Sequence, residues 1–215
     1  LHLITSLAIA AAEITDEATT LHLSTPGQLP EGWTPTADQL HWTRPNTDLI
    51  DTGARVDQAP YPLMVSVGET LVEVGETPAV WVVNLEELGA LSIGGDPERA
   101  RDFARHLAAQ VAVQPWSRDV TVDLVGIGEE ATGLGDRVRY RPAAAATEAA
   151  QETIADAVAT SDRARECDTD TATARTGSID DDLWPARLLV IDMPDVPDLL
   201  EDPDQDAGAD PTAST

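Results

Sequence analysis

Lysine is missing from this chain, and cysteine occurs once. Its 13 basic residues are all arginine, and against 39 acidic residues they leave the 215-residue chain with a formal net charge of −26. Such a charge repels nucleic-acid phosphates and anionic membrane surfaces, so we expect no direct binding to DNA or RNA. The single cysteine, Cys167, excludes an intramolecular disulfide and stands in a polar run without metal-ligand spacing.

Metal-binding motifs and long apolar runs are also missing. The four histidines, His2, His22, His41 and His106, are scattered and lack the short spacings of metal ligands. No stretch approaches the roughly 18 consecutive apolar residues of a transmembrane helix. Residues 1–15 contain an apolar run but neither the basic region nor the cleavage site of a signal peptide. These absences predict a cytoplasmic chain with no membrane segment and no cofactor.

The chain does contain enough apolar material for one medium-sized domain. Apolar residues make up 42% of the sequence and aromatic residues 4%, so we expect a core of aliphatic side chains. Residues 1–59 are predicted to form a small α+β segment that ends in a linker, with a helix over 1–18 and strands over 18–26 and 39–45. The acidic residues 197–215 predict a disordered tail or a linker.

Residues 60–196 alternate between strand-like and helix-like patterns. Apolar residues spaced by three and four predict helices over 96–113 and 147–166. This alternation is typical of an α/β fold, and we expect a mostly parallel sheet with flanking helices. The predicted strands are 62–70, 77–88, 89–95, 118–129, 137–142 and 186–194, with 137–142 at an edge.

The junction between the predicted strand 89–95 and the next helix is a candidate phosphate-binding turn. A helix N-terminus presents unpaired N–H groups and the positive end of the helix dipole, and Gly94 and Gly95 allow a tight turn there. If a nucleotide is bound, Gly94, Gly95 and Asp96 are the candidate cofactor-binding residues. A P-loop, however, requires GxxxxGK[ST], and this chain has no lysine to reach the phosphates.

A capped structural turn explains the same residues and is the interpretation we favour. Asp96 is a good N-cap because its carboxylate accepts hydrogen bonds from the free N–H groups of the helix. Pro97 suits the first helical position, where its missing N–H costs nothing. Glu98 adds a second negative charge in the first turn. Two carboxylates would then stand where a bound phosphate needs positive charge.

Two buried-type strands end in acidic residues that could hold a metal ion. The apolar residues Leu188–Ile191 are followed by Asp192, the pattern of the strand that carries the magnesium-binding aspartate in P-loop ATPases. If a nucleotide is bound, Asp192 is the candidate metal ligand, with Asp123 as the other acid that could lie near the metal. Glu129 and Glu130 follow the other strand, but paired acids in so acidic a chain are usually solvated surface residues.

The order and the amino-acid sequences of these segments resemble a region of large multidomain proteins of actinobacteria. Those proteins carry N-terminal membrane helices, a LysM module and a bacterial transcriptional activator domain, and the resembling region lies in the middle. The region is also similar to a degenerate relative of the P-loop ATPase domains of DNA translocases and type VII secretion motors, with GGDPERAR in place of the Gly-Lys-Ser/Thr loop. The resemblance covers about residues 20–192 and rests on LHLSTPGQLPEGW, PYPLMVSVGE, VVNLEELGALSIGGDPERARDFARHLAAQVAVQPWSRDVTVDLVGIGEE and DDLWPARLLVID.

The resemblance implies that the chain is part of a longer protein, so two functions stay open. The first is a non-catalytic α/β module of a regulatory or envelope-associated protein, which contacts protein partners or neighbouring domains and is tethered to a membrane only through other parts of that protein. The second is a residual nucleotide-binding, ATPase-like domain that uses the turn Gly94–Pro97. A receptor for a small molecule or anion at the carboxyl ends of the strands follows from the fold class alone.

Overall fold

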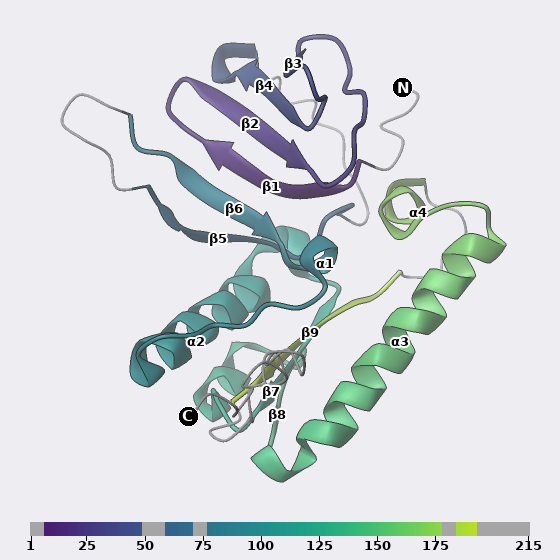
Figure 1. Ribbon diagram of the computed structural model, residues 1–215. Helices are drawn as coiled ribbons and strands as arrows, with labels where there is room; N and C mark the ends of the chain where they lie inside the picture. The colour runs from purple at the N-terminus through teal and green to yellow at the C-terminus, as the bar shows by residue number, and fades with distance from the viewer. Residues whose placement is uncertain (1–6, 49–58, 71–76, 178–183, 193–215) are drawn as a thin grey trace, which may run out of the picture.

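The structure, a computed structural model, describes residues 7–48, 59–70, 77–177 and 184–192. Its larger sheet has six antiparallel strands in the order β3-β4-β2-β1-β6-β5 (Figure 1). The strands of this sheet are β1 (Ile9–Ile14), β2 (Ala18–Leu23), β3 (Thr34–Pro35), β4 (His41–Pro45), β5 (Met64–Glu69) and β6 (Val80–Asn84).

A smaller sheet of three parallel strands lies beside the larger one. Its order is β8-β7-β9, so the predicted edge strand over 137–142 does lie at an edge. These strands are β7 (Val120–Val125), β8 (Val138–Arg141) and β9 (Ala186–Ile191), and the helices are α1 (Leu85–Leu88), α2 (Pro97–Val113), α3 (Ala146–Glu166) and α4 (Thr171–Gly177).

The mixed α/β content confirms the predicted class, but the expectation of a mostly parallel sheet is wrong. Most strands belong to the antiparallel sheet. The three-residue turn between β1 and β2 is too short for a crossover and permits only antiparallel pairing. Within the described residues, parallel pairing is confined to β7, β8 and β9, where α3 and α4 lie in the long connection from β8 to β9.

Two local predictions fail because tertiary pairing overrides a local pattern. The helix predicted over 1–18 is wrong from Ile9 to Ile14, where β1 is paired with β2 and β6; residues 1–6 lie outside the described residues. The strand predicted over 89–95 is also wrong, because this segment pairs with no strand in the described chain and is mostly exposed. Only Ile93 packs against the core from it.

Strands from both sides of the boundary expected near Pro60 share one sheet. Central strand β1 pairs with β2 on one side and with β6 on the other, in the register Ala12 opposite Val82. The predicted strand over 77–88 ends early, because Asn84 caps the short helix α1 by accepting a hydrogen bond from the N–H of Glu86. The tail predicted over 197–215 lies outside the described residues.

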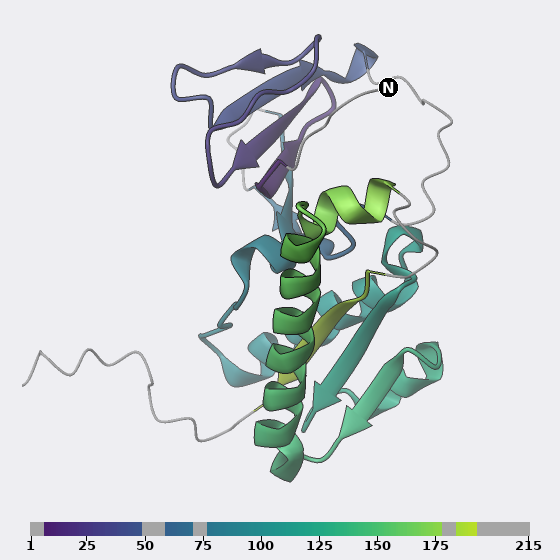
Figure 2. The ribbon, with the colours of Figure 1, turned by 90° about the vertical axis from the view of Figure 1, so that its right-hand side faces the viewer.

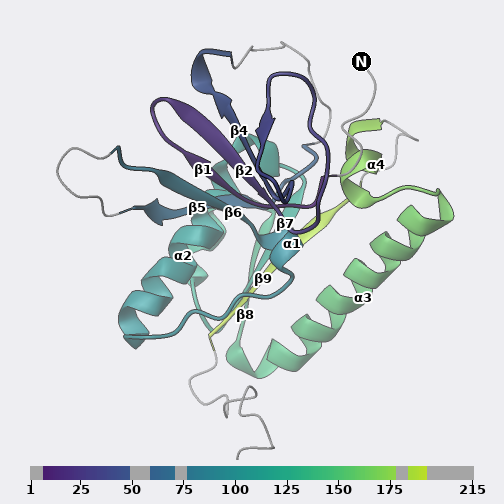
Figure 3. The ribbon, with the colours of Figure 1, turned by 45° about the horizontal axis from the view of Figure 1, so that its top comes forward.

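Helices α2 and α3 cover opposite faces of the parallel sheet (Figures 1 and 3). Leu107 and Val111 of α2 pack with Val122 and Leu124 of β7 in the main apolar core. Side chains alternate along a strand, so the other face of β7 meets α3, where Val125 packs with alanines of that helix. Figure 2 shows α3 lying across the parallel strands.

Helix α2 also covers the edge strand β5 of the antiparallel sheet. The Gln110 side chain accepts from the N–H of Ser66 at 3.0 Å and donates to the Ser66 carbonyl at 2.8 Å. Gln114 donates to the Met64 carbonyl at 2.9 Å. These bonds satisfy backbone groups that an open sheet edge would leave free, and they join the two sheets through one helix. In the parts of the chain that the structure describes, no helix is long and apolar enough to cross a bilayer.

Two valines on α2 test the position of the core. Val111 is fully buried and Val113 is 65% exposed. Val111→Ala should lower the free energy of unfolding by about 2 kcal/mol, because it removes two buried methyl groups and leaves a cavity. Val113→Ala carries the same change in helix propensity and should cost less than about 0.5 kcal/mol. Urea unfolding measures both; equal losses would contradict this packing.

Candidate functional site

The Gly94–Gly95 turn lies at the surface, immediately before α2. Gly95 has φ +106°, a conformation that side chains with a Cβ rarely adopt, so the backbone itself requires glycine there. A Cβ built on either glycine would meet open space within 4 Å. The turn therefore requires glycine at position 95 because of its positive φ. At Gly94, no neighbouring group comes close enough to exclude a larger side chain.

The predicted cap at Asp96 is present in the structure. Its side chain accepts a hydrogen bond from the N–H of Arg99 at 3.0 Å, and Pro97 occupies the first turn of α2. Glu98 accepts from the guanidinium of Arg101 at 2.9 Å. A phosphate at this helix N-terminus would have to displace the Asp96 carboxylate and approach the charge of Glu98. The residues present are those of a capped helix and do not fit a phosphate group.

Asp192 lies at the carboxyl end of β9 and is held by α2. Its Oδ2 accepts from Nε of Arg101 at 2.8 Å, and its backbone N–H donates to the carbonyl of Val125. The hydrogen bond to Asp192 raises the pKa of Arg101. The structure thus places Asp192 near the start of α2, as the nucleotide hypothesis requires, but a guanidinium neutralises the carboxylate that a metal ion would use.

Asp123 lies on the opposite face of the parallel sheet from Asp192. It occupies the middle of β7 and faces α3, whereas Asp192 faces α2 through Arg101. The sheet therefore separates these two acids, and they cannot share a metal ion. Glu129 and Glu130 begin an exposed 3-10 turn after β7, where Glu130 lies 3.3 Å from Nε of Arg105.

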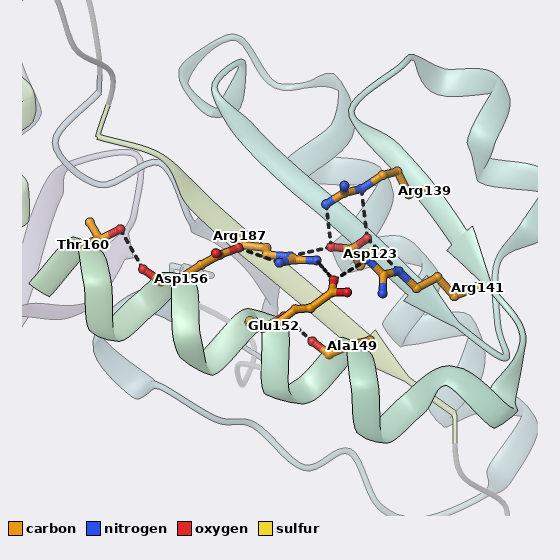
Figure 4. Close-up of polar contacts among 9 residues, drawn as sticks. Asp123, Arg139, Arg141, Ala149, Glu152, Asp156, Thr160 and Arg187 are labelled. Atoms are coloured by element: carbon orange, nitrogen blue, oxygen red, sulfur yellow. Dashed lines mark hydrogen bonds and ion pairs between the residues drawn. The ribbon is translucent and has the colours of Figure 1, made fainter.

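A cluster of ion pairs surrounds the buried side chain of Asp123 (Figure 4). The Asp123 side chain has no exposure to water, yet the flanking strands β8 and β9 bring three guanidinium groups within ion-pair distance of it. Nε of Arg187 donates to Oδ2 at 2.6 Å, and Nε of Arg139 lies 3.0 Å from Oδ1. We call this cluster the Asp123 network; its members are Asp123, Arg139, Arg141, Glu152, Asp156 and Arg187.

The outer half of the Asp123 network ties α3 to the sheet. Nη1 of Arg187 donates to Asp156 at 2.6 Å and Nη2 donates to Glu152 at 3.1 Å. Arg141 donates to the same oxygen of Glu152 at 2.5 Å. Arg141, and then Arg187, lower the pKa of Glu152 to about 2. Three guanidinium groups thus face three carboxylates, and the network is neutral.

The Asp123 network could have been suspected from the sequence but was missed. Asp123 interrupts the apolar strand VTVDLV, and Arg139 and Arg141 alternate in RVRYR. A lone acid in a buried strand requires a partner, and an edge strand with arginines on alternate positions presents them on one face. The signal was therefore available in the strands, although it did not reveal that Glu152 and Asp156 of the helix complete the cluster.

The buried guanidinium of Arg175 joins α4 to α1 and to the segments at Pro60 and Trp184. Arg175 of α4 is 3% exposed and forms a two-pronged pair with Glu86 of α1, at 2.7 and 2.8 Å. It also donates to the carbonyls of Trp184 and Pro60. Trp184 packs in a small core between α3 and α4, and Arg163 lies over its ring at 4.3 Å. This tryptophan therefore serves core packing.

The arrangement of these groups is that of structural ion pairing. In the described ranges of the chain, no three His, Cys, Asp or Glu residues are placed to hold a metal ion. Hollows beside the turn after β7 and beside Trp184 measure about 10 Å³ each, which is space for one water molecule. Comparisons with protein-family models, curated proteins and solved structures give no match.

The depressed pKa of Glu152 predicts a pH-dependent contribution to stability. Its pKa falls from 4.5 to about 2 on folding, so its stabilising effect is complete above pH 4.5 and is lost as the pH falls towards 2. The difference in unfolding free energy between wild type and Glu152→Gln should therefore shrink as the pH is lowered from about 6 to about 3. Urea unfolding across this range measures it.

Glu148→Gln provides the control, because Glu148 lies exposed one turn earlier on α3. Its difference from wild type gives the background effect of removing one carboxylate from this helix. A Glu152→Gln difference that stays constant from about pH 6 to about pH 3 would show that Glu152 forms no ion pair in the folded protein.

Proposed function

We propose that the chain is a non-catalytic α/β module that works by contacting protein partners or neighbouring domains of a longer protein. The observation that carries the proposal is the self-occupied nucleotide site. The Asp96 side chain caps the N-terminus of α2, and the Arg101 side chain is hydrogen-bonded to the carboxylate of Asp192. The two candidate acids, Asp96 and Asp192, are thus each bonded to another group of the same chain.

Electrostatics support the same proposal. A nucleotide triphosphate needs positive charge at its phosphates, and P-loop proteins supply it with a lysine and a magnesium ion. Here the turn presents Asp96 and Glu98, in a chain with a net charge of −26. Arg101 of α2 is bonded to both Glu98 and Asp192.

The resemblance to actinobacterial multidomain proteins gives the proposal its context. We infer that the chain is a degenerate relative of the P-loop ATPase domains of DNA translocases and type VII secretion motors, retained as a scaffold in a cytoplasmic part of a regulatory or envelope-associated protein. The order of segments over residues 20–192 supports this relationship. The loss of lysine at the turn supports the loss of catalysis.

Residual nucleotide binding is the second candidate. One observation favours it: the carboxyl end of β9 and the first turns of α2 meet through the contact between Arg101 and Asp192. Asp192 thus lies near a helix N-terminus, the part of a helix that binds phosphates in P-loop proteins. In this alternative, Gly94, Gly95 and Asp96 would contact the phosphates, and Asp192 would exchange Arg101 for the metal ion.

Thermal unfolding with and without millimolar ATP or GTP plus Mg²⁺ distinguishes the two candidates. A ligand present at 100 times its Kd would stabilise the folded chain by about 2.7 kcal/mol and raise Tm by several degrees. We expect no saturable rise in Tm. A saturable rise that disappears in both Gly95→Val and Asp192→Asn would contradict the proposal and establish the nucleotide site. Wild type with Mg²⁺ alone controls for effects of the ion on this acidic chain.

A further inference from the structure

Two histidines that are distant in the sequence become neighbours on the antiparallel sheet. His22 of β2 lies directly opposite His41 of β4, and their ring centroids are 4.9 Å apart. The N–H of Leu23 donates to the carbonyl of Leu40, so the next pair along these strands, His22 and His41, is a non-hydrogen-bonded pair. Facing side chains come closest in such pairs. The pairing of β2 with β4 thus brings two imidazoles within reach of one small ligand.

A carboxylate lies near each of the two imidazoles. Nε2 of His22 is 3.9 Å from Oε2 of Glu13 on β1, and Nδ1 of His41 is 3.8 Å from Oδ1 of Asp38 in the turn before β4. We call Glu13, His22, His41 and Asp38 the histidine cluster. Its side chains are between 22% and 53% exposed, so an ion in solution can reach them.

His22 has a ring nitrogen without a hydrogen bond. Its Nε2 is buried and has no hydrogen-bond partner in the described chain, because the distance to Glu13 is too long for a hydrogen bond. Leaving such an atom unpaired costs free energy, so it calls for an explanation. The ring of Trp81 on β6 packs against His22 at 4.9 Å and limits its movement.

A metal ion on the imidazoles would satisfy this atom. When one ring nitrogen of a histidine binds a metal, the other carries the proton and usually donates it to a carboxylate. Nε2 of His22 faces Glu13, and Nδ1 of His41 faces Asp38. Each imidazole therefore has a carboxylate for its N–H and keeps its other nitrogen for an ion.

We propose that His22 and His41 bind one divalent transition-metal ion, such as Zn²⁺, with Glu13 and Asp38 as hydrogen-bond partners of the two rings. Imidazole nitrogen selects zinc, copper or nickel over magnesium and calcium, which prefer oxygen ligands. The His41 side chain is 42% exposed and is free to turn about χ2, which directs its Nε2 at the ion.

The chain supplies two ligands, and water completes the coordination of the ion. This donor set agrees with the finding that no three His, Cys, Asp or Glu residues in the described parts of the chain are placed to hold a metal. The bound ion would join β2 to β4 and so stabilise the antiparallel sheet. The proposal does not rest on the non-catalytic function proposed above.

A titration of the full chain with Zn²⁺ tests the site, with the ring ¹⁵N signals of the histidines as the readout. At about pH 7.5 the imidazoles are mostly neutral and can bind a metal. We expect Zn²⁺ to shift the signals of His22 and His41 together and to leave those of His106 on α2 unchanged. Mg²⁺ at the same concentration should shift none of them.

Three variants separate the site from general attraction of cations to an acidic chain. His41→Gln removes one ligand from a side chain that is 42% exposed, and it should abolish the Zn²⁺-dependent shift of His22. Glu13→Gln should weaken Zn²⁺ binding about tenfold or more, because the His22 ring loses its carboxylate partner. Glu17→Gln makes the same change of charge at an exposed position in the turn after β1, and it should bind as wild type does.

Three results would overturn the proposal. The first is a Zn²⁺ titration to millimolar concentration that shifts neither ring, or only one of the two. The second is binding to His41→Gln that is as tight as binding to wild type, because the ion would then lie elsewhere. The third is equal weakening by Glu13→Gln and Glu17→Gln, because charge alone would then explain the affinity.

Discussion

The buried carboxylate of Asp123 is the constraint on which the parallel sheet and its helix α3 depend. An ion taken out of water loses several kcal/mol of hydration, which only close partners restore. Because Asp123 is in the central strand β7, its partners must come from the neighbouring strands, and Arg139 and Arg187 do so. The pairing of β8 and β9 with β7 therefore satisfies this charge as well as the backbone.

The same constraint determines what α3 can contribute. Arg187 spends one N–H group on Asp123, and its remaining donors require acceptors, which Glu152 and Asp156 of α3 supply. The side of α3 that would normally carry leucine or valine is thus occupied by acids. On the other face of the sheet, α2 packs in the ordinary way with Leu107 and Val111. The α2 side of the sheet is held by the main apolar core, whereas the α3 side combines these ion pairs with a small apolar cluster around Val125.

The two faces of the parallel sheet therefore differ in the residues that they carry. The candidate nucleotide residues Asp96 and Asp192 lie on the α2 side and are bonded to Arg99 and Arg101. The α3 side leaves Ile154 and Val158 in solvent. The charges that bind α3 to the sheet balance one another at a partly exposed contact, whereas the whole chain has a net charge of −26.

The elements that the sequence predicts well are those with signals inside a short window. Asp96, Pro97 and the regular apolar spacing define α2, and the apolar runs around Val122 and Val190 define β7 and β9. Pairing between distant segments is not encoded locally. The alanine-rich residues of β1 become a strand because β2 and β6 flank them, and Arg187 meets Asp123 across 64 residues of sequence. The candidate turn and its cap were predictable, whereas the ion-pair network required the fold.

A double-mutant cycle between Asp123 and Arg187 tests the central claim most directly. Urea unfolding of wild type, Asp123→Asn, Arg187→Met and the double variant gives the coupling free energy of this pair. If Asp123 holds Arg187 in place for α3, the coupling should be about 2 kcal/mol, so the double variant should lose about 2 kcal/mol less stability than the sum of the two single losses. A coupling of less than about 0.5 kcal/mol would contradict the account, because the two side chains would then contribute independently and α3 would be held by other contacts.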